Sequence, residues 1–114
     1  MSEIPDVFDT GSYPAVNVED TEKGIIITIT GYFSCGYEDQ LKLAIFAAAE
    51  KKPKEILIDF SKVEWMCSCF IGVLIEGLKR CRELEINLVL ARIPARLMPK
   101  FQQGCLVHMF EIRD

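Results

Sequence analysis

The sequence predicts a single α/β domain whose mixed, mostly parallel sheet begins with an antiparallel hairpin and carries three helices. Its 114 residues suit one domain, and because half of them are apolar a continuous core is available. A β-branched run at residues 24–30 gives a strong strand signal, and strand-like and helix-like segments alternate after it. Such alternation is typical of parallel strands joined by right-handed helical crossovers, so the expected order is β-β-α-β-α-β-α-β.

The chain is expected to open with a loose arm, followed by the hairpin. Residues 1–13 have weak periodicity and contain proline and glycine, which predicts a flexible N-terminal arm ahead of a domain at residues 14–114. Residues 15–19 alternate in polarity and form the first strand, and turn residues separate them from the second strand at residues 24–30. Gly31 is expected to end that second strand.

One helix is expected between the hairpin and the next strand. It begins at Ser34 or Gly36, and Pro53 stops it after a basic pair that suits a helix C-terminus. Its buried face is formed by apolar residues at helical spacing, namely Leu41, Ala44, Ile45 and Ala48. A near-continuous apolar run at residues 55–60 then predicts a strand buried on both faces, and residues 61–66 are expected to be a short connector.

The second half of the chain repeats the alternation. Residues 70–85 have the pattern of an amphipathic helix, and residues 86–91 that of another buried strand. Pro94 is expected to open a short helix that ends or kinks just before Pro99, because proline breaks a helix interior. Residues 107–112 are the predicted last strand.

Charge and composition weigh against several classes of partner. Thirteen basic and seventeen acidic residues give a net charge of −4, which disfavours nucleic acid and an anionic membrane surface. The apolar stretches are too short to span a bilayer, and the acidic N-terminus does not look like a secretory signal. An odd number of cysteines suits a reducing compartment, so the expected location is cytoplasmic.

The cysteines are expected to be packing thiols rather than metal ligands. There are five of them: Cys35, Cys67, Cys69, Cys81 and Cys105. Residues 67–69 form a C-x-C pair, which could be imagined as a metal site with Cys35, Cys105 and His108. Structural zinc sites prefer two C-x₂₋₄-C units, and there is no second pair, so no metal and no cofactor is predicted. A redox switch at Cys67 or Cys69 remains an alternative, because a thiol at a helix N-terminus can become reactive.

The sequence does not predict an enzyme. His108 is the only histidine, and it falls in the predicted last strand, where it is a poor candidate for the base that activates a cysteine. Neither of the glycine-rich nucleotide-phosphate motifs is present. A binding role is therefore expected.

One segment carries a family resemblance. Residues 58–74 read Ile-Asp-Phe-Ser-Lys-Val-Glu-Trp-Met-Cys-Ser-Cys-Phe-Ile-Gly-Val-Leu. They resemble the STAS-domain signature, in which a strand ends in an aspartate and, after a short loop, Asp-Ser-Ser-Gly-hydrophobic-Gly opens a helix. Asp59 and Gly72 keep the pattern, and Pro94 followed by Gly104 resembles the family's later helix and its closing glycine. The resemblance implies a STAS-like fold of the β/α superhelical type.

Several positions depart from this signature. Cys67 stands where the family has the motif aspartate, and Ser68 is the first motif serine. Cys69 replaces the second serine, which in this family is the usual phosphorylation target of a partner kinase, and Phe70 replaces the glycine that follows. Ser34 lies in a loop where the family often has an aspartate.

The resemblance implies a regulator of transcription of the anti-sigma-factor-antagonist kind that works by partner switching. Its implied partner is an ATP-binding, histidine-kinase-like serine kinase that doubles as an anti-sigma factor and is released on phosphorylation. A phosphate adds about −1.5 to −2 charges, which oppose binding at a neutral docking face. With Cys69 at the usual site, the switch is expected to be lost or moved to Ser68, whose hydroxyl is alternatively the N-cap of the helix.

The expected docking face is the corner between the strand ending near residue 66 and the following helix, with the loop after the second strand beside it. Its predicted contact residues are Ser34, Cys35, Met66, Cys67, Ser68, Cys69, Phe70 and Gly72. Exposed large apolar residues there, among Trp65, Met66 and Phe70, would anchor a partner. Asp59 is interpreted either as a loop-capping carboxylate that orders Ser61 and its neighbours or as directly functional. A small-ligand sensor and a homo-oligomeric scaffold subunit of the same fold are the alternative functions.

Overall fold

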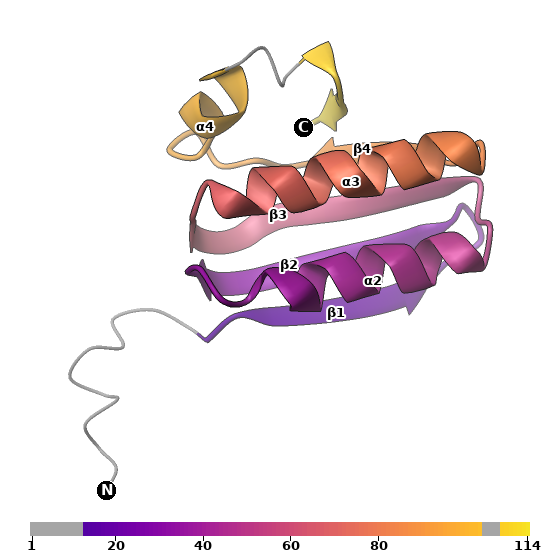
Figure 1. Ribbon diagram of the computed structural model, residues 1–114, viewed down its shortest axis with the longest axis horizontal. Helices are drawn as coiled ribbons and strands as arrows, with labels where there is room; N and C mark the ends of the chain where they lie inside the picture. The colour runs from indigo at the N-terminus through magenta and orange to yellow at the C-terminus, as the bar shows by residue number, and fades with distance from the viewer. Residues whose placement is uncertain (1–12, 104–107) are drawn as a thin grey trace, which may run out of the picture.

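The computed structural model describes residues 13–103 and 108–114, which form a five-stranded sheet with helices packed against it (Figure 1). In chain order the elements are β1 (Ala15–Asp20), β2 (Ile25–Phe33), α2 (Glu38–Glu50), β3 (Glu55–Met66), α3 (Cys69–Glu83), β4 (Asn87–Ala91), α4 (Met98–Gln102) and β5 (Glu111–Arg113). The strands lie in the order β1-β2-β3-β4-β5; β1 is antiparallel to β2, and every other pair is parallel. The predicted fold class, with its N-terminal hairpin and three helices, is confirmed.

The two long helices lie side by side over one face of the sheet (Figure 1). Isoleucines of β2 and β3, such as Ile27 and Ile58, are fully buried and meet the apolar face of α2 at Leu41 and Ile45. Gly77 of α3 lets the helices approach closely, because a Cβ there would lie 2.9 Å from a methyl group of Ile45. The core therefore fixes both helices relative to the parallel strands, and with them the loops at the strand ends.

Strands β2 and β3 are longer than the sequence predicted. Gly31 does not end β2, and residues 61–66 are not a connector, because they continue β3 and pair with β2 as far as Phe33 and Met66. Two register shifts, in each of which β3 carries one more residue than β2, accompany this extension, and Gly31 adopts a φ of +105° in β2. The extension still faces the core at Val63 and Met66, which are buried on either side of the second register shift.

The C-terminal elements also differ from the prediction. The short helix α4 begins at Met98 and not at Pro94, and it holds Pro99 in its first turn, where a missing N–H leaves no helical bond unmade. Strand β5 covers only Glu111–Arg113, so His108 precedes it instead of lying within it. Gly104 and the start of the predicted last strand lie outside the described residues.

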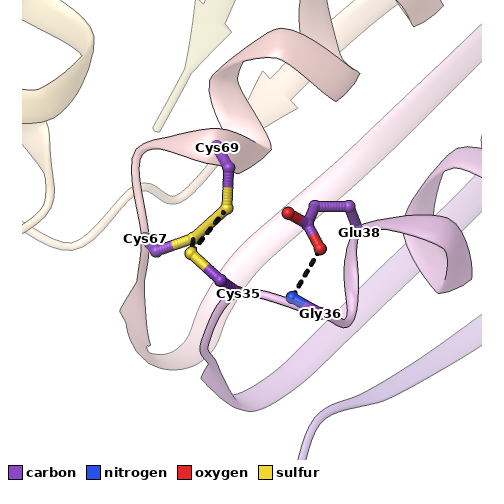
Figure 2. Close-up of a disulfide and its surroundings, with 5 residues drawn as sticks. All are labelled: Cys35, Gly36, Glu38, Cys67 and Cys69. Carbon is purple, nitrogen blue, oxygen red and sulfur yellow. Dashed lines mark hydrogen bonds between the residues drawn. A yellow bond between two sulfur atoms is a disulfide. The ribbon is translucent and has the colours of Figure 1, made fainter.

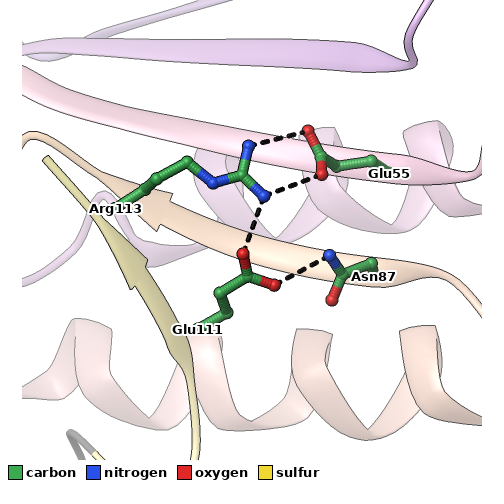
Figure 3. Close-up of polar contacts among 4 residues, drawn as sticks. All are labelled: Glu55, Asn87, Glu111 and Arg113. Carbon is green, nitrogen blue, oxygen red and sulfur yellow. Dashed lines mark hydrogen bonds and ion pairs between the residues drawn. The ribbon is translucent and has the colours of Figure 1, made fainter.

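A polar network holds β5 in place at the edge of the sheet (Figure 3). The guanidinium of Arg113 donates to both carboxylate oxygens of Glu55 on β3, at 3.0 and 3.3 Å, and to Glu111 at 2.7 Å. Glu111 also accepts from the side-chain amide of Asn87 on β4, at 2.9 Å. These contacts tie β5 to the first residues of β3 and β4.

Among the described residues, no helix is long and apolar enough to cross a membrane.

Candidate functional site

Two chain segments meet at the carboxyl ends of β2 and β3. Because these strands are parallel, the loop that follows β2 and the corner that follows β3 leave the same edge of the sheet. The backbone N–H of Cys67 donates to the carbonyl of Phe33 at 2.9 Å, which joins the two strand ends directly. The loop from Ser34 to Tyr37 therefore lies beside the corner at residues 66–72 that leads into α3. Together the two segments form the predicted docking face, which we call the docking corner.

The structure divides the predicted contact residues into a surface set and a buried set. Cys35, Ser68 and Gly72 are exposed, and Ser34 and Cys69 are half-buried. Three others belong to the core: Met66 at 1% exposure, Cys67 at 7% and Phe70 at 0%. The prediction of Met66 and Phe70 as partner contacts is therefore wrong, because both side chains are buried in the core, and the two do not form an exposed anchor.

Phe70 is buried because its ring is part of the aromatic core beneath the corner. It packs edge-on against Phe33, with ring centroids 5.3 Å apart and an interplanar angle of 83°. Phe33 is the last residue of β2, so this pair fastens the start of α3 to the end of that strand. Phe70 supports the shape of the docking corner from within.

Trp65 is the one residue of the expected anchor that remains partly accessible. Its ring stacks on that of Tyr32 at a centroid distance of 5.0 Å, and the ammonium of Lys100 lies 5.1 Å from its centroid. Trp65 also lines a hollow of about 530 Å³ together with Ser68, Arg96 and Lys100. Two cationic side chains thus line the same hollow as the Ser68 hydroxyl.

Ser68 precedes α3 but does not cap it with its side chain. Its φ and ψ of −63° and −22° are already helical, and its hydroxyl makes no capping hydrogen bond. A capping side chain requires the extended backbone that Ser68 lacks, so the N-cap interpretation of the hydroxyl is wrong. The hydroxyl is instead exposed at the docking corner.

Asp59 is buried in the first half of β3, at 6% exposure, and both of its oxygens are hydrogen-bonded. One accepts from the backbone N–H of Ser61 at 2.9 Å, where β3 carries its first extra residue, and the other accepts from Arg92. Burial alone raises the pKa of Asp59, but the bonds from Arg92 and Ser61 outweigh it and hold the pKa below its usual value. The bond from Ser61 is the contact expected of a carboxylate that orders Ser61, but Ser61 lies within β3, so Asp59 supports a strand at its register shift and not a loop.

Three cysteines of the corner form a cluster in which Cys35 is exposed, Cys69 is half-buried and Cys67 is buried (Figure 2). Cys67 and Cys69 form a disulfide, and the sulfur of Cys35 lies 3.0 Å from that of Cys67 and 3.2 Å from that of Cys69. Cys81 is different: it is fully buried, and burial raises the pKa of its thiol to about 11, as expected of a packing thiol. Cys105 lies outside the described residues.

Sequence reasoning considered these three cysteines together but favoured packing thiols, and that interpretation is wrong for Cys35, Cys67 and Cys69, whose sulfurs lie side by side. A signal for the cluster existed. The family resemblance placed the loop at residues 34–36 beside the helix start, and this loop contains Cys35. His108, which was weighed with these cysteines as an imagined ligand, is not part of the group of metal-ligating side chains that the described residues bring together.

Comparison with known proteins gives one family and a consistent set of folds. A family model described as the STAS domain matches residues 14–114. The anti-sigma factor antagonist SpoIIAA in its unphosphorylated form is 16% identical, with 86% of this chain and 87% of that chain covered and a TM-score of 0.74. An anti-sigma factor antagonist from Mycobacterium paratuberculosis is 22% identical, with coverages of 89% and 86% and a TM-score of 0.73.

A putative anti-sigma factor antagonist from Thermotoga maritima is likewise 16% identical, with coverages of 87% and 86% and a TM-score of 0.73. Because these identities are low, the three solved structures are evidence for the fold alone. No curated protein matches the sequence.

Proposed function

Since the chain belongs to the STAS domain family, we propose that it is a cytoplasmic regulatory module of the anti-sigma-factor-antagonist kind, which binds a protein partner and is not an enzyme. The proposed partner is an ATP-binding serine kinase of the histidine-kinase-like type that doubles as an anti-sigma factor. One observation carries the proposal: the docking corner presents Ser68 and Gly72 to solvent, directly beside the loop that contains Cys35.

The corner has the properties of a preorganised recognition surface. Its exposed residues lie at the start of α3 and on the loop that follows β2. A backbone hydrogen bond from Cys67 to Phe33 joins these two segments where they leave the sheet, and Phe70 and Met66 fix the corner from inside. A partner therefore meets a surface that is already ordered, which lowers the entropic cost of association. The partner's contacts are proposed to be with Ser34, Cys35, Ser68, Cys69 and Gly72.

The phosphoswitch of this kind of protein is proposed to be lost at position 69 and, where it operates, to act at Ser68. Cys69 has no hydroxyl, and its sulfur is bonded to that of Cys67. The Ser68 hydroxyl is exposed and makes no capping bond, and Arg96 and Lys100 line the same hollow. A phosphate there would be met by positive charge on this chain and would place a new anion in the partner's path.

Gly72→Arg tests the docking corner without disturbing the fold. A Cβ at Gly72 has no heavy atom within 4 Å, and replacing a helical glycine is expected to favour the helix, so the variant should remain folded. Its large side chain would project into the partner, and we expect binding to the purified kinase to weaken by about tenfold or more in calorimetric titration. Ala47→Arg is the matched control, because it adds the same side chain at an exposed position of α2 nine residues beyond the start of that helix.

Equal affinities for the Gly72→Arg and Ala47→Arg variants, with both proteins folded, would place the partner's contact surface elsewhere on the domain.

Phosphorylation is tested on the unmodified chain. After incubation with the partner kinase and ATP, we expect either no phosphate or phosphate on Ser68 alone, as read by peptide mass spectrometry. Ser68→Ala is the control, and it should abolish any label, because Cys69 offers no alternative hydroxyl. Phosphate on any other residue would contradict the assignment of Ser68.

A further inference from the structure

The cluster formed by Cys35, Cys67 and Cys69 has chemistry that protein docking does not require. We propose that the chain, once its disulfide is reduced, binds one soft, thiophilic metal cation through these three thiolates. Zn²⁺ is the reference ion for this proposal. The proposed metal site concerns cysteine ligation only and does not depend on which partner the docking corner binds.

The positions of the sulfur atoms carry the proposal. All three lie within 4.8 Å of one another, and they are the only such group of metal-ligating side chains in residues 13–103 and 108–114. A tetrahedral zinc ion with Zn–S bonds of about 2.3 Å holds its sulfurs about 3.8 Å apart. Cys35 is already 3.0 and 3.2 Å from the other two, so it needs to withdraw by less than ~1 Å to reach that spacing.

The ligand set selects the class of ion. Three thiolates with no nearby carboxylate or imidazole in the group favour soft cations such as Zn²⁺ or Cu⁺ over Mg²⁺ and Ca²⁺, which prefer oxygen. Three protein ligands leave the fourth position of a tetrahedral ion open to water or another ligand. Cys35 is exposed and Cys69 is half-buried, so an ion can reach the sulfurs from solvent.

The backbone on both sides of the cluster is held in place. The N–H of Cys67 is bonded to the Phe33 carbonyl, and the N–H of Gly36, next to Cys35, donates to the carboxylate of Glu38 at 2.6 Å (Figure 2). Gly36 has a φ of +107°, a conformation that suits glycine and turns the chain sharply after Cys35. The ligands therefore come from two segments whose backbone is already ordered, so metal binding costs less conformational entropy.

The local electrostatics favour thiolates. Cys69 is the first residue of α3, a helix of 15 residues, so it lies at the positive end of the helix dipole. The first turn of α3 contains no acidic residue that would oppose a thiolate. The start of α3 therefore suits the negative charge of bound thiolates.

Binding requires prior reduction of the Cys67–Cys69 disulfide, because a sulfur bonded to sulfur is not a thiolate ligand. A thiol reductant of the cell supplies two electrons and two protons and is itself oxidised to a disulfide, which leaves two thiols on this chain. The cation then displaces the thiol protons as its three metal–sulfur bonds form. Under the reducing conditions of a cytoplasm, the reduced, metal-binding form of the cluster is the form expected to be present.

The test begins with cobalt titration of the full chain. The protein is reduced with a phosphine, freed of reductant without oxygen, and titrated with Co²⁺, whose thiolate complexes absorb strongly by charge transfer, before Zn²⁺ is added to displace it. We expect saturation at one equivalent. Each of the substitutions Cys35→Ser, Cys67→Ser and Cys69→Ser should weaken binding by more than ~100-fold, because loss of an outer-shell partner alone costs about 10–100-fold. Cys81→Ala, which removes a thiol twelve residues further along α3, should leave binding unchanged.

A second measurement needs no substitution, which matters because Cys67 is buried and its serine variant could fail to fold. In the reduced, unmodified chain, one equivalent of Zn²⁺ should slow alkylation of Cys35, Cys67 and Cys69 together by tenfold or more, as roughly expected for loss of free thiolate. The proposal is overturned if the folded, reduced chain develops no charge-transfer absorption, if Cys35→Ser keeps the affinity of the unmodified chain, or if Zn²⁺ leaves alkylation at Cys35 unchanged.

Discussion

Replacing Phe70 by alanine is expected to lower the free energy of unfolding by about 3–5 kcal/mol, the cost of deleting a fully buried aromatic side chain. The ring has no exposed surface, and it packs against Phe33 at the point where β2 and α3 are joined. Phe70→Gly, which restores the residue typical of the resembled signature, should cost about 0.5–1 kcal/mol more, since glycine also weakens a helix. Urea unfolding followed by circular dichroism measures both changes.

Leu43 provides the matched control for this prediction. It is a large apolar residue on a helix, but its exposure is 68%, so Leu43→Ala should change stability by less than about 0.5 kcal/mol. Unfolding midpoints for Phe70→Ala and Leu43→Ala that coincide with that of the unmodified chain would mean that Phe70 is not part of the core.

The strong elements of the fold could be predicted because their signals are local. The β-branched run of β2, the helical spacing in α2 and the apolar run at the start of β3 each predict their element without any information from the rest of the chain. The second half of β3 could not be recognised in this way. Its exposed Ser61, Lys62 and Glu64 give a polar appearance, and its regular alternation is broken by the extra residues that shift its register against β2.

The location of the candidate site could be predicted from the sequence, but which of its side chains point to solvent could not. The signature identified the corner, yet it could not show that Phe70 of α3 points inward. That orientation depends on the packing of its ring against Phe33, which lies at the end of β2. The cysteine cluster depends in the same way on where β2 and β3 end relative to one another, which is a tertiary property. Local pattern thus located the surface, and the packing of distant segments determined which residues it displays.

Asp59→Asn is expected to destabilise the domain at neutral pH, with an effect that shrinks in acid. Asn keeps the shape, and its one oxygen can still accept the N–H of Ser61, but its NH₂ group then faces the guanidinium of Arg92. The bond from Arg92 is therefore lost, and the bond from Ser61 no longer goes to a charged oxygen. The expected loss is about 1–3 kcal/mol at pH 7, for a carboxylate that is almost fully buried and bonded to Arg92. Because Asp59 anchors the backbone at the register shift of β3, its loss should loosen the strand that leads to the docking corner.

The pH dependence follows from the direction of the pKa shift. The pKa of Asp59 is lowered in the folded chain from an ordinary value of 3.8, so its stabilisation is complete above that value and is lost as pH falls through the lower, folded pKa. The stability difference between the unmodified chain and Asp59→Asn, measured in urea at pH 7, 5 and 3, should therefore be constant from pH 7 to 5 and smaller at pH 3. Glu83→Gln is the matched control, because it removes a carboxylate that pairs with Arg80 at the surface, where solvent screens the charge and the change should be much smaller. A difference for Asp59→Asn that is absent at pH 7, or that grows in acid, would show that the bonds from Arg92 and Ser61 do not stabilise this carboxylate in the folded chain.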